Sequence, residues 1–503
     1  MARKIAGWLH LSGRLTFPSG VAVGGLTGLA DVDLSLARDA SEGFIIPGTS
    51  LAGVLRAQAA ALGLDVGLLF GGSDADQGAS ALMISDARFD RDAGVELRDH
   101  IGIDRRTGGG APGVLFRREL ISAGETAMLH ATVELPLAEA EQGARRQALA
   151  DLIGALEDGD VSVGASSSRG LGWVVLDQVD VREERLADIT QMLTGQPAPA
   201  AELPLARRLA VSTVFRVAWT TKAPLMVKAG RDGVAIDGLP LTVRSRDRTA
   251  VQLILPGSSV KGRLRSLADY ITRTVTSQSA PEAFLDQLSQ LAVVDRIFGA
   301  RPHGPDQRGA RGAVRVNDVV LATVPMAIWR ALADAKKTDG SDAELRNAVA
   351  ALDRDGWGLR SESRLDVATH VAIDRWTGSS AGPRLYTALE PQLAGRKQFE
   401  IHVDPHRLGE DELGRAAAFL WLLLLREVAS GSVGFGFGTQ RGYGSIEVPE
   451  GLAGVTIEGS ARGVFAGLGG AENLDRVPNS AVEPLQNAWV AYIEAAKDQE
   501  GQL

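Results

Sequence analysis

Several residue types are missing or scarce in this chain of 503 residues. It has no cysteine, which excludes disulfides, cysteine-based zinc or iron–sulfur sites and a thiol nucleophile. Its seven histidines are scattered along the chain, with one His-x-x-x-His pair at His402 and His406, and a histidine metal site is not expected. Four tyrosines and 13 phenylalanines leave little material for a broad aromatic stacking surface.

Long apolar runs and an overall positive charge are also missing. The most apolar run, residues 416–425, is shorter than the roughly 20 residues that span a bilayer, so it predicts a buried helix and no membrane partner. The N-terminus lacks a signal-peptide pattern, and we expect a cytoplasmic protein. Because the net charge is −9, nucleic-acid binding needs local support.

The clearest positive feature is an internal duplication. FIIPGTSLAGVLRA (44–57) returns as LILPGSSVKGRLRS (253–266), and HIGIDRRTGGGAPGVLF (100–116) returns as HVAIDRWTGSSAGPRLY (370–386). Three further pairs follow the same order: 68–72 with 296–300, 80–89 with 312–321, and 163–176 with 433–448. The shared order excludes chance similarity.

The duplication sets the domain boundaries. We predict a first copy over 1–187, a Pro/Ala-rich linker over 188–209 and a second copy over 210–450. The second copy carries an insertion at about 323–365, and residues 451–503 form a tail.

Each copy has the same predicted order of strands and helices. Alternating patterns predict opening strands at 8–17 and 215–227. Apolar periodicity predicts four helices, at 50–63, 139–159, 259–275 and 410–430. We expect Ser or Thr to be the N-cap of the helix after each Pro-Gly pair. This order predicts an α+β fold of ferredoxin-like type, with helices on one face of an antiparallel sheet.

The repeated motifs supply the candidate binding residues. A helix N-terminus suits a phosphate, although an ordinary capped helix is the alternative. The candidates at the two helix starts are Ser50, Arg56, Ser258, Ser259, Lys261, Arg263 and Arg265. The IDRxTG segments predict protruding basic hairpins that carry Arg105, Arg106 and Arg375, and the glycine-rich loops carry Arg169 and Arg441. A solvated surface hairpin and a tight helix-to-strand connection are the alternatives.

Local charge differs between the copies. Residues 222–265 hold nine basic and three acidic side chains, a net charge of +6, which is typical of phosphate contact. The matching stretch 11–56 has a net charge of −1. A loop acid precedes each Pro-Gly pair, Asp33 in the first copy and Asp237 in the second. Such a carboxylate suits a divalent metal or a proton transfer from a ribose hydroxyl, and a plain surface acid is the alternative.

Together, IPGSS-x-KG-x-LR-like helix starts, VAIDRxTG and a late RGYG loop resemble RAMP proteins of CRISPR systems. The chain is most similar to the Cas-seven family backbone subunit of type III effector complexes, in a tandem fusion of III-D or III-E-like type. The resemblance covers about 1–187 and 210–450. It implies two modified ferredoxin-like (RRM-like) domains, each with a thumb hairpin and a glycine-rich loop.

The resemblance also implies a function. Such subunits bind guide CRISPR RNA and other effector subunits, and they cut complementary target RNA with a divalent metal, here expected to be Mg²⁺. The essential aspartate maps to Asp33 and Asp237, which are thereby the predicted catalytic and metal-binding residues. Asp31 is an alternative to Asp33 as the catalytic residue of the first copy, because this copy lacks the Ile-Asp-x-x-Pro pattern.

Three other functions stay open. The chain is alternatively a non-catalytic scaffold for guide RNA, or a guide-processing endoribonuclease that uses His100 or His370, which recur at matched positions. The most distant alternative is an enzyme or shell protein without nucleic acid, which co-purified RNA would exclude.

Overall fold

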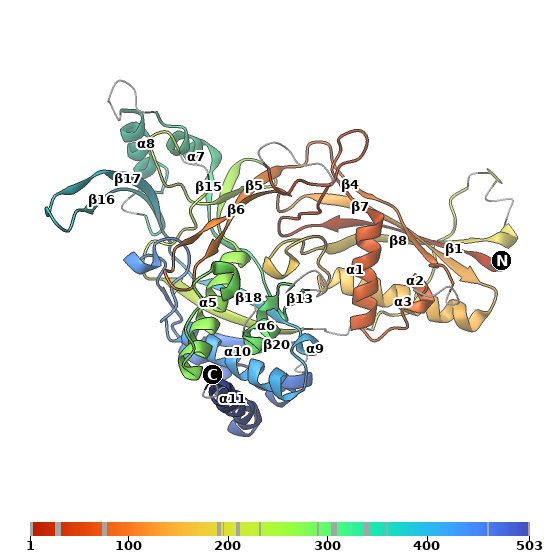
Figure 1. Ribbon diagram of the computed structural model, residues 1–503. Helices are drawn as coiled ribbons and strands as arrows, with labels where there is room; N and C mark the ends of the chain where they lie inside the picture. Colours follow the sequence, from red (N-terminus) through yellow and green to blue (C-terminus); the bar gives the residue numbers. More distant parts are fainter. Residues whose placement is uncertain are drawn as a thin grey trace. The chain divides into compact units, whose positions relative to one another are not determined.

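The computed structural model describes residues 4–25, 32–72, 78–188, 193–194, 196–207, 212–230, 233–288, 291–302, 309–336, 343–358, 361–459 and 462–500 (Figure 1). The chain divides into two compact units. The first comprises Met1–Leu97, Arg117–Ser167 and Leu171–Val211, and the second comprises Arg98–Phe116, Ser168–Gly170 and Ser212–Leu503. Among the described residues, no helix is both long and apolar enough to cross a membrane.

The first unit is built on an antiparallel sheet in the order β2-β4-β7-β1-β8, with β3 also pairing with β7. Its strands are β1 (Ile5–Thr16), β2 (Ile45–Ile46), β3 (Leu82–Ile84), β4 (Ala87–Phe89), β7 (Thr126–Pro136) and β8 (Val175–Arg185). The helices are α1 (Gly48–Ala61), α2 (Gly67–Phe70) and α3 (Glu139–Glu157). Every second residue of β1 is buried, as its alternating sequence predicts. These residues pack with the apolar faces of α1 and α3 into one core.

The second unit repeats this plan in the sheet β14-β18-β9-β19, with β20 also on β9. Its strands are β9 (Thr213–Thr221), β14 (Val314–Val316), β18 (Lys397–Val403), β19 (Ile446–Glu447) and β20 (Val455–Glu458). A second sheet contains β10 (Thr242–Arg244), β11 (Ala250–Leu255) and β15 (Val319–Pro325), and β12 (Gly299–Ala300) pairs with β13 (Ala310–Arg311). The helices are α5 (Gly257–Thr276), α6 (Ala292–Phe298), α9 (Pro405–Leu408) and α10 (Glu412–Ala429).

Equivalent strands take the same places in both sheets. In each unit the opening strand lies between the third strand and the last strand of the βαββαβ order, which is the ferredoxin-like arrangement. The predicted α+β class is therefore confirmed. The apolar run at 416–425 lies in α10, where Trp421 is fully buried with its ring 6.0 Å from that of Phe215.

Both predicted hairpins are present. The first consists of β5 (Val95–Ile103) and β6 (Gly110–Ile121), and the second consists of β16 (Arg364–Ile373) and β17 (Ser380–Gln392). The second hairpin projects from its unit (Figure 1). The tip of the first, 98–116, belongs to the second compact unit although its sequence lies in the first copy.

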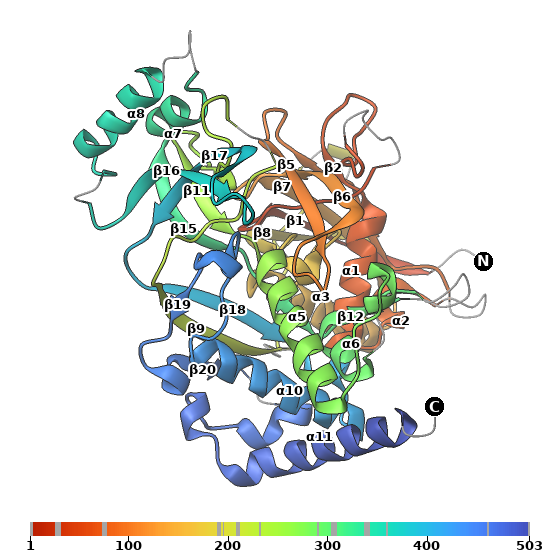
Figure 2. The same cartoon turned by 60° about the vertical axis from the view of Figure 1, so that its left-hand side comes forward.

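Segments outside the repeat have structure of their own. The insertion forms α7 (Met326–Ala333) and α8 (Ala343–Arg354) between β15 and β16. In the tail, α11 (Asn479–Glu500) lies along α10 (Figure 2), with the rings of Phe419 and Trp489 6.4 Å apart. Short 3₁₀ turns complete the chain at Ser167–Arg169, Leu186–Asp188, Phe284–Gln287, Thr439–Arg441, Gly451–Gly454, Gly463–Leu468 and Leu474–Arg476.

Part of the predicted linker is fastened to the first unit. Arg207 donates from Nη2 and Nε to Asp151 Oδ2 at 2.6 and 2.9 Å, and from its backbone N to Oδ1 at 2.7 Å. Asp151 lies on α3 and is only 1% exposed. Burial raises the pKa of this carboxyl, but the hydrogen bonds from Arg207 outweigh burial and hold the pKa below its ordinary value of 3.8.

Replacing Arg207 with alanine is expected to lower the free energy of unfolding at pH 7, because the buried carboxylate of Asp151 loses both hydrogen bonds from the guanidinium. A carboxyl with a lowered folded pKa stabilises the fold above pH 3.8 and loses this effect as the pH falls through the folded pKa. The deficit of Arg207→Ala should therefore shrink at acid pH. Denaturant unfolding at pH 7 and 3 measures it, with Arg185→Ala as the control, since Arg185 is exposed and its partner Glu183 keeps its ion pair with Arg146. An equal effect of both substitutions at pH 7 would contradict this expectation.

Candidate nucleic-acid interface

The two predicted acids occupy equivalent positions at the bases of the hairpins. Asp33 Oδ2 accepts a hydrogen bond from the backbone N of Arg117 at 2.7 Å. Asp237 Oδ2 accepts one from the backbone N of Thr387 at 2.8 Å. Both acids are exposed at the surface. Each loop acid is therefore tied to the returning strand of its own hairpin.

The residue that follows each acid is also paired with the returning strand of the hairpin in the same way in both copies. Leu34 forms a parallel bridge with Arg118, and Gly238 forms one with Ala388. These pairings align Asp33, and no other first-copy acid that the structure describes, with Asp237. Asp31 lies outside the described residues.

The carboxylates fit a metal only in combination with further ligands. Within the described ranges, no group of three or more His, Cys, Asp or Glu side chains is placed to hold an ion. Mg²⁺ commonly binds through one or two carboxylates together with substrate phosphates. Asp33 or Asp237 thus suits an ion shared with a nucleic-acid phosphate, with one carboxylate oxygen supplied by the protein.

The predicted Ser or Thr N-caps are wrong. Both helices have the proline of the Pro-Gly pair as N-cap, with no side-chain cap hydrogen bond. Instead the first helical N–H donates to a distant aspartate, Gly48 N to Asp86 Oδ1 and Gly257 N to Asp318 Oδ1, both at 2.8 Å. These carboxylates satisfy one of the free N–H groups that a phosphate would otherwise use.

Close packing explains why glycine follows the proline in both copies. A Cβ at Gly257 would lie 2.0 Å from the carbonyl oxygen of Val316, and one at Gly48 would lie 2.2 Å from that of Ile84. No side chain fits there. The repeated Pro-Gly pair is therefore required by packing whether or not the helix start binds a phosphate.

The predicted serines and Arg56 are accessible. Ser50, Ser258 and Ser259 are half-buried in the first turns of their helices, and Arg56 is exposed on α1. Their contact with RNA stays a prediction.

The predicted cations of α5 make contacts inside the protein. Lys261 is 6% exposed and donates from Nζ to the Val314 carbonyl at 2.8 Å. Arg265 donates to Asp295 Oδ1 and to the Gly299 carbonyl, both at 2.9 Å. Arg263 Nε donates to the carbonyl of Gly434 at 3.1 Å. Direct phosphate contact by Lys261 is not favoured in this arrangement.

Lys261 nevertheless marks a cationic cluster, which we define as Lys261, Arg265, Arg169 and Arg311. Burial, and then the charges of Arg169, Arg265 and Arg311, hold the pKa of Lys261 well below its ordinary value. Arg169 and Arg311 are exposed. Like charges held together in this way suit an anionic ligand. Sequence reasoning missed Arg311, and its only signal was the nearby run of arginines in RGARGAVRV.

The predicted hairpin arginines have different surroundings. Arg105 Nε bonds to Asp269 Oδ2 at 2.7 Å, and both side chains are largely buried. Arg106 is half-exposed, and its Nη1 lies 3.9 Å from Glu282 Oε1. Arg375 is exposed at the tip of the second hairpin. Arg106 and Arg375 can reach a nucleic acid, and Arg105 holds the first hairpin in place.

Both hairpin tips also present apolar groups that sequence reasoning missed. Trp376 is 95% exposed at the second tip. Aliphatic side chains are exposed at positions 270 residues apart in the two hairpins: Ile101, Ile103 and Leu115, and Val371, Ile373 and Leu385. Exposed apolar side chains on a narrow ribbon can enter between bases. The alternating apolar residues in the hairpin strands were the sequence signal that could have revealed these groups.

The glycine-rich loops fold back on themselves. A Cβ at Gly172 would lie 1.8 Å from the Val163 carbonyl oxygen, and one at Gly444 would lie 1.8 Å from that of Phe435. Arg441 is exposed within the second loop. The loops therefore present arginine from a tight backbone turn.

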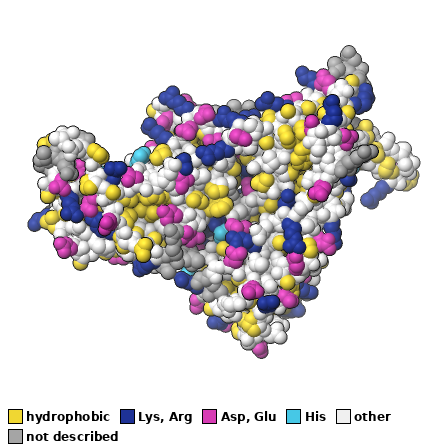
Figure 3. Space-filling view, turned by 180° about the vertical axis from the view of Figure 1, so that it is seen from behind, with side chains coloured by type: hydrophobic (Ala, Val, Ile, Leu, Met, Phe, Trp, Pro, Cys, Tyr) yellow, Lys and Arg dark blue, Asp and Glu magenta, His cyan; other side chains and the backbone are white. Residues whose placement is uncertain are grey.

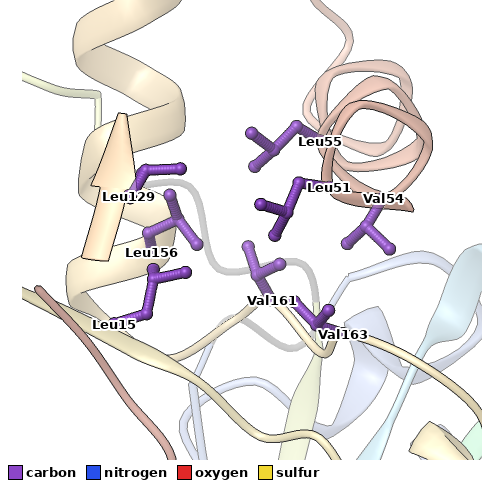
Figure 4. A pocket seen from close by; sticks show the side chains of 8 residues that line it. All are labelled: Leu15, Leu51, Val54, Leu55, Leu129, Leu156, Val161 and Val163. Atoms are coloured by element: carbon purple, nitrogen blue, oxygen red, sulfur yellow. The ribbon is translucent and has the colours of Figure 1, made fainter. Parts of the chain in front are cut away.

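The cavity in Figure 4 lies in the first unit and is lined only by aliphatic side chains: Leu15, Leu51, Val54, Leu55, Leu129, Leu156, Val161 and Val163. On the face in Figure 3, basic and acidic side chains are interspersed and do not form one continuous basic surface. The hairpin bases and the cationic cluster remain the candidate sites.

Comparison with known proteins supports a nucleic-acid role. A family model described as "RAMP superfamily" matches residues 14–175 and 220–447, one region in each copy. RAMP proteins generally bind CRISPR RNA and other Cas subunits, and some are RNA endonucleases. No curated protein matches the chain.

Proposed function

The chain belongs to the RAMP superfamily, and on this basis we propose that it is a backbone subunit of a type III CRISPR effector complex. In this proposal it binds guide RNA and cuts complementary target RNA at one aspartate site in each copy. The observation that carries the proposal is the matched attachment of Asp33 and Asp237 to the hairpin bases through Arg117 and Thr387.

The hairpins supply the geometry of the proposed reaction. In-line attack requires a nucleotide held out of helical geometry, and the exposed apolar tips suit this task. The ribose 2′-oxygen bonds to the adjacent phosphorus and the bond from phosphorus to the 5′-oxygen breaks. The products are a 2′,3′-cyclic phosphate and a 5′-hydroxyl. Only RNA has the required hydroxyl, so DNA is spared.

The aspartates supply the proton chemistry. Among the described residues, the second oxygen of each carboxylate has no hydrogen-bond partner. This oxygen takes the 2′-hydroxyl proton, and the 5′-oxygen receives a proton from water. A bound Mg²⁺, held by the same carboxylate and the RNA phosphate, would stabilise negative charge at phosphorus.

The cationic cluster supplies guide binding in this proposal. Arg169 and Arg311 are exposed over the buried Lys261, and lysine and arginine mostly contact phosphates without reading sequence. Local charge of this kind offsets the net charge of −9.

The test is to isolate the complex, identify its RNA, and incubate it with a labelled complementary target and Mg²⁺. We expect cuts at regular spacing, loss of cutting with a chelator, and no cutting of the DNA equivalent. Guide binding without any cuts would instead support the scaffold function, and cutting of the guide precursor alone would support processing.

A further inference from the structure

The tip of the first hairpin is held by buried side chains of the second copy. Asp104 Oδ2 accepts a hydrogen bond from Gln287 Nε2 at 2.9 Å, and Arg105 Nε donates to Asp269 Oδ2 at 2.7 Å. The backbone N of Arg105 donates to Gln287 Oε1 at 2.7 Å. Gln287 and Asp269 are 2% and 4% exposed. We call Asp269 on α5, together with Phe284 and Gln287 of the following 3₁₀ turn, the receiver.

Two further contacts make the receiver selective for this hairpin. A Cβ at Gly102 would lie 2.5 Å from the ring of Phe284, so any other residue would force the ring to move. Arg98, only 4% exposed, donates from Nη1 to Asp318 Oδ2 at 2.9 Å. The contact therefore requires a small residue at one position of the hairpin and a cation at another.

The second hairpin keeps the central Asp-Arg pair of this contact. Asp374 and Arg375 follow Asp104 and Arg105 by 270 residues. Each aspartate accepts at Oδ1 from the backbone N–H groups two and three residues later, so the two turns match. Among the described residues, however, Asp374 Oδ2 and the Arg375 guanidinium have no hydrogen-bond or ion-pair partner. The groups that hold the first tip are thus unused in the second.

The first unit of another copy of this chain offers no receiver for them. Counted from the Pro-Gly pairs, Ala60 of α1 stands where α5 has Asp269. The connection from α1 to α2 covers only 62–66, whereas the second copy has 277–291 between α5 and α6. The first copy therefore lacks a segment that could match Phe284 and Gln287.

The second unit of another copy is unsuitable as well. Its receiver is occupied by its own first hairpin. The second hairpin also has Ala372 at the place of Gly102, where a Cβ meets Phe284, and Ala368 at the place of Arg98. Neither the small residue nor the cation that the receiver selects is present.

We propose that Asp374 and Arg375 form a docking surface for a different protein, which presents a carboxylate to Arg375 and a side-chain amide to Asp374. Successive copies of this chain then do not join through their hairpins, and the contact between the first hairpin and the receiver stays within one chain. The inference rests on the proposed function, because it names the surface on which this subunit meets another protein of the complex.

Site-specific cross-linking tests this surface. The chain has no cysteine, so Ser379→Cys places a single thiol at the exposed tip for a maleimide–benzophenone probe. The labelled full chain is isolated in its complex and irradiated, and the joined peptides are identified by mass spectrometry. We expect a cross-link to a second protein and none to another copy of this chain. Adding Arg375→Glu should lower its yield at least about tenfold, because it sets like charges against each other.

Matched variants identify the contact. Arg354→Glu makes the same charge change at an exposed position on α8 and should leave the yield unchanged. Replacing the acidic residue nearest the cross-link in the second protein with arginine should restore the yield with Arg375→Glu. Equal yields in Arg375→Glu and the parent chain, or no rescue by the reversed pair, would overturn the docking surface.

The remaining outcomes separate this inference from the proposed function. A cross-link to a second copy of this chain overturns the choice of partner. Loss of RNA affinity in Arg375→Glu at an unchanged cross-link yield means that Arg375 contacts nucleic acid, and overturns the inference as well. A complex that cuts target RNA without the cross-link overturns the inference alone. A chain that binds neither RNA nor another protein overturns both proposals.

Discussion

Replacing Asp237 with alanine is expected to slow one cut in the target RNA by about 10²–10⁴-fold, the usual loss when a general base is removed. Guide binding should stay nearly unchanged, because Asp237 is exposed and its carboxylate accepts a hydrogen bond from the backbone of its own hairpin, at Thr387. Mapping the cuts along one target with the assembled complex measures the effect. Asp247→Ala, an exposed acid held by Ser245 and Thr249, is the control and should leave every cut.

The same measurement tests whether the copies act independently. Asp33→Ala should remove a different cut, and the double substitution should remove both, because each acid binds its own hairpin base. If Asp33→Ala leaves every cut while Asp31→Ala removes one, Asp31 is the first-copy acid. A full cut pattern in Asp237→Ala would show that the catalytic assignment is wrong, and loss of guide RNA would make Asp237 structural.

Reversing the charge of Arg169 and Arg311 is expected to weaken guide binding by at least about tenfold at 0.15 M salt. Both arginines are exposed beside the buried Lys261, so their substitution should leave the core intact. The slope of log affinity against log salt should become shallower by about 0.7 for each lost phosphate contact. Binding titrations of Arg169→Glu/Arg311→Glu over a salt series measure both quantities.

Two controls distinguish lost phosphate contacts from a general effect of charge and from sequence-specific binding. Arg346→Glu/Arg426→Glu makes the same charge change at exposed positions on α8 and α10 and should keep the native salt slope. Guides of unrelated sequence should all be weakened equally, because phosphate contacts carry no sequence information. A loss confined to particular guides, or an equal loss in the control, would contradict backbone binding by the cluster.

Whether the sequence could predict a feature of the site depends on how far apart the interacting residues lie along the chain. The matched placement of Asp33 and Asp237 was predictable, because an acid recurs in the loop before each Pro-Gly pair, 14 residues before Pro47 and 19 residues before Pro256. The N-caps were not, because the carboxylates at the helix starts come from 38 and 61 residues away. The basic patch of the second copy was visible as composition, but composition does not show that Lys261 points inward to a carbonyl.

The amino-acid sequence by itself determined the duplication, the α+β order and the two hairpins, because these depend on local periodicity and on motifs that recur in one order. The tertiary structure alone decided which charges meet. It brought Arg169 of the first copy to Lys261 of the second, and it joined Glu390 to Tyr443 across 53 residues. Pairing and burial of polar groups depend on contacts between distant segments, and a local pattern carries no record of those contacts.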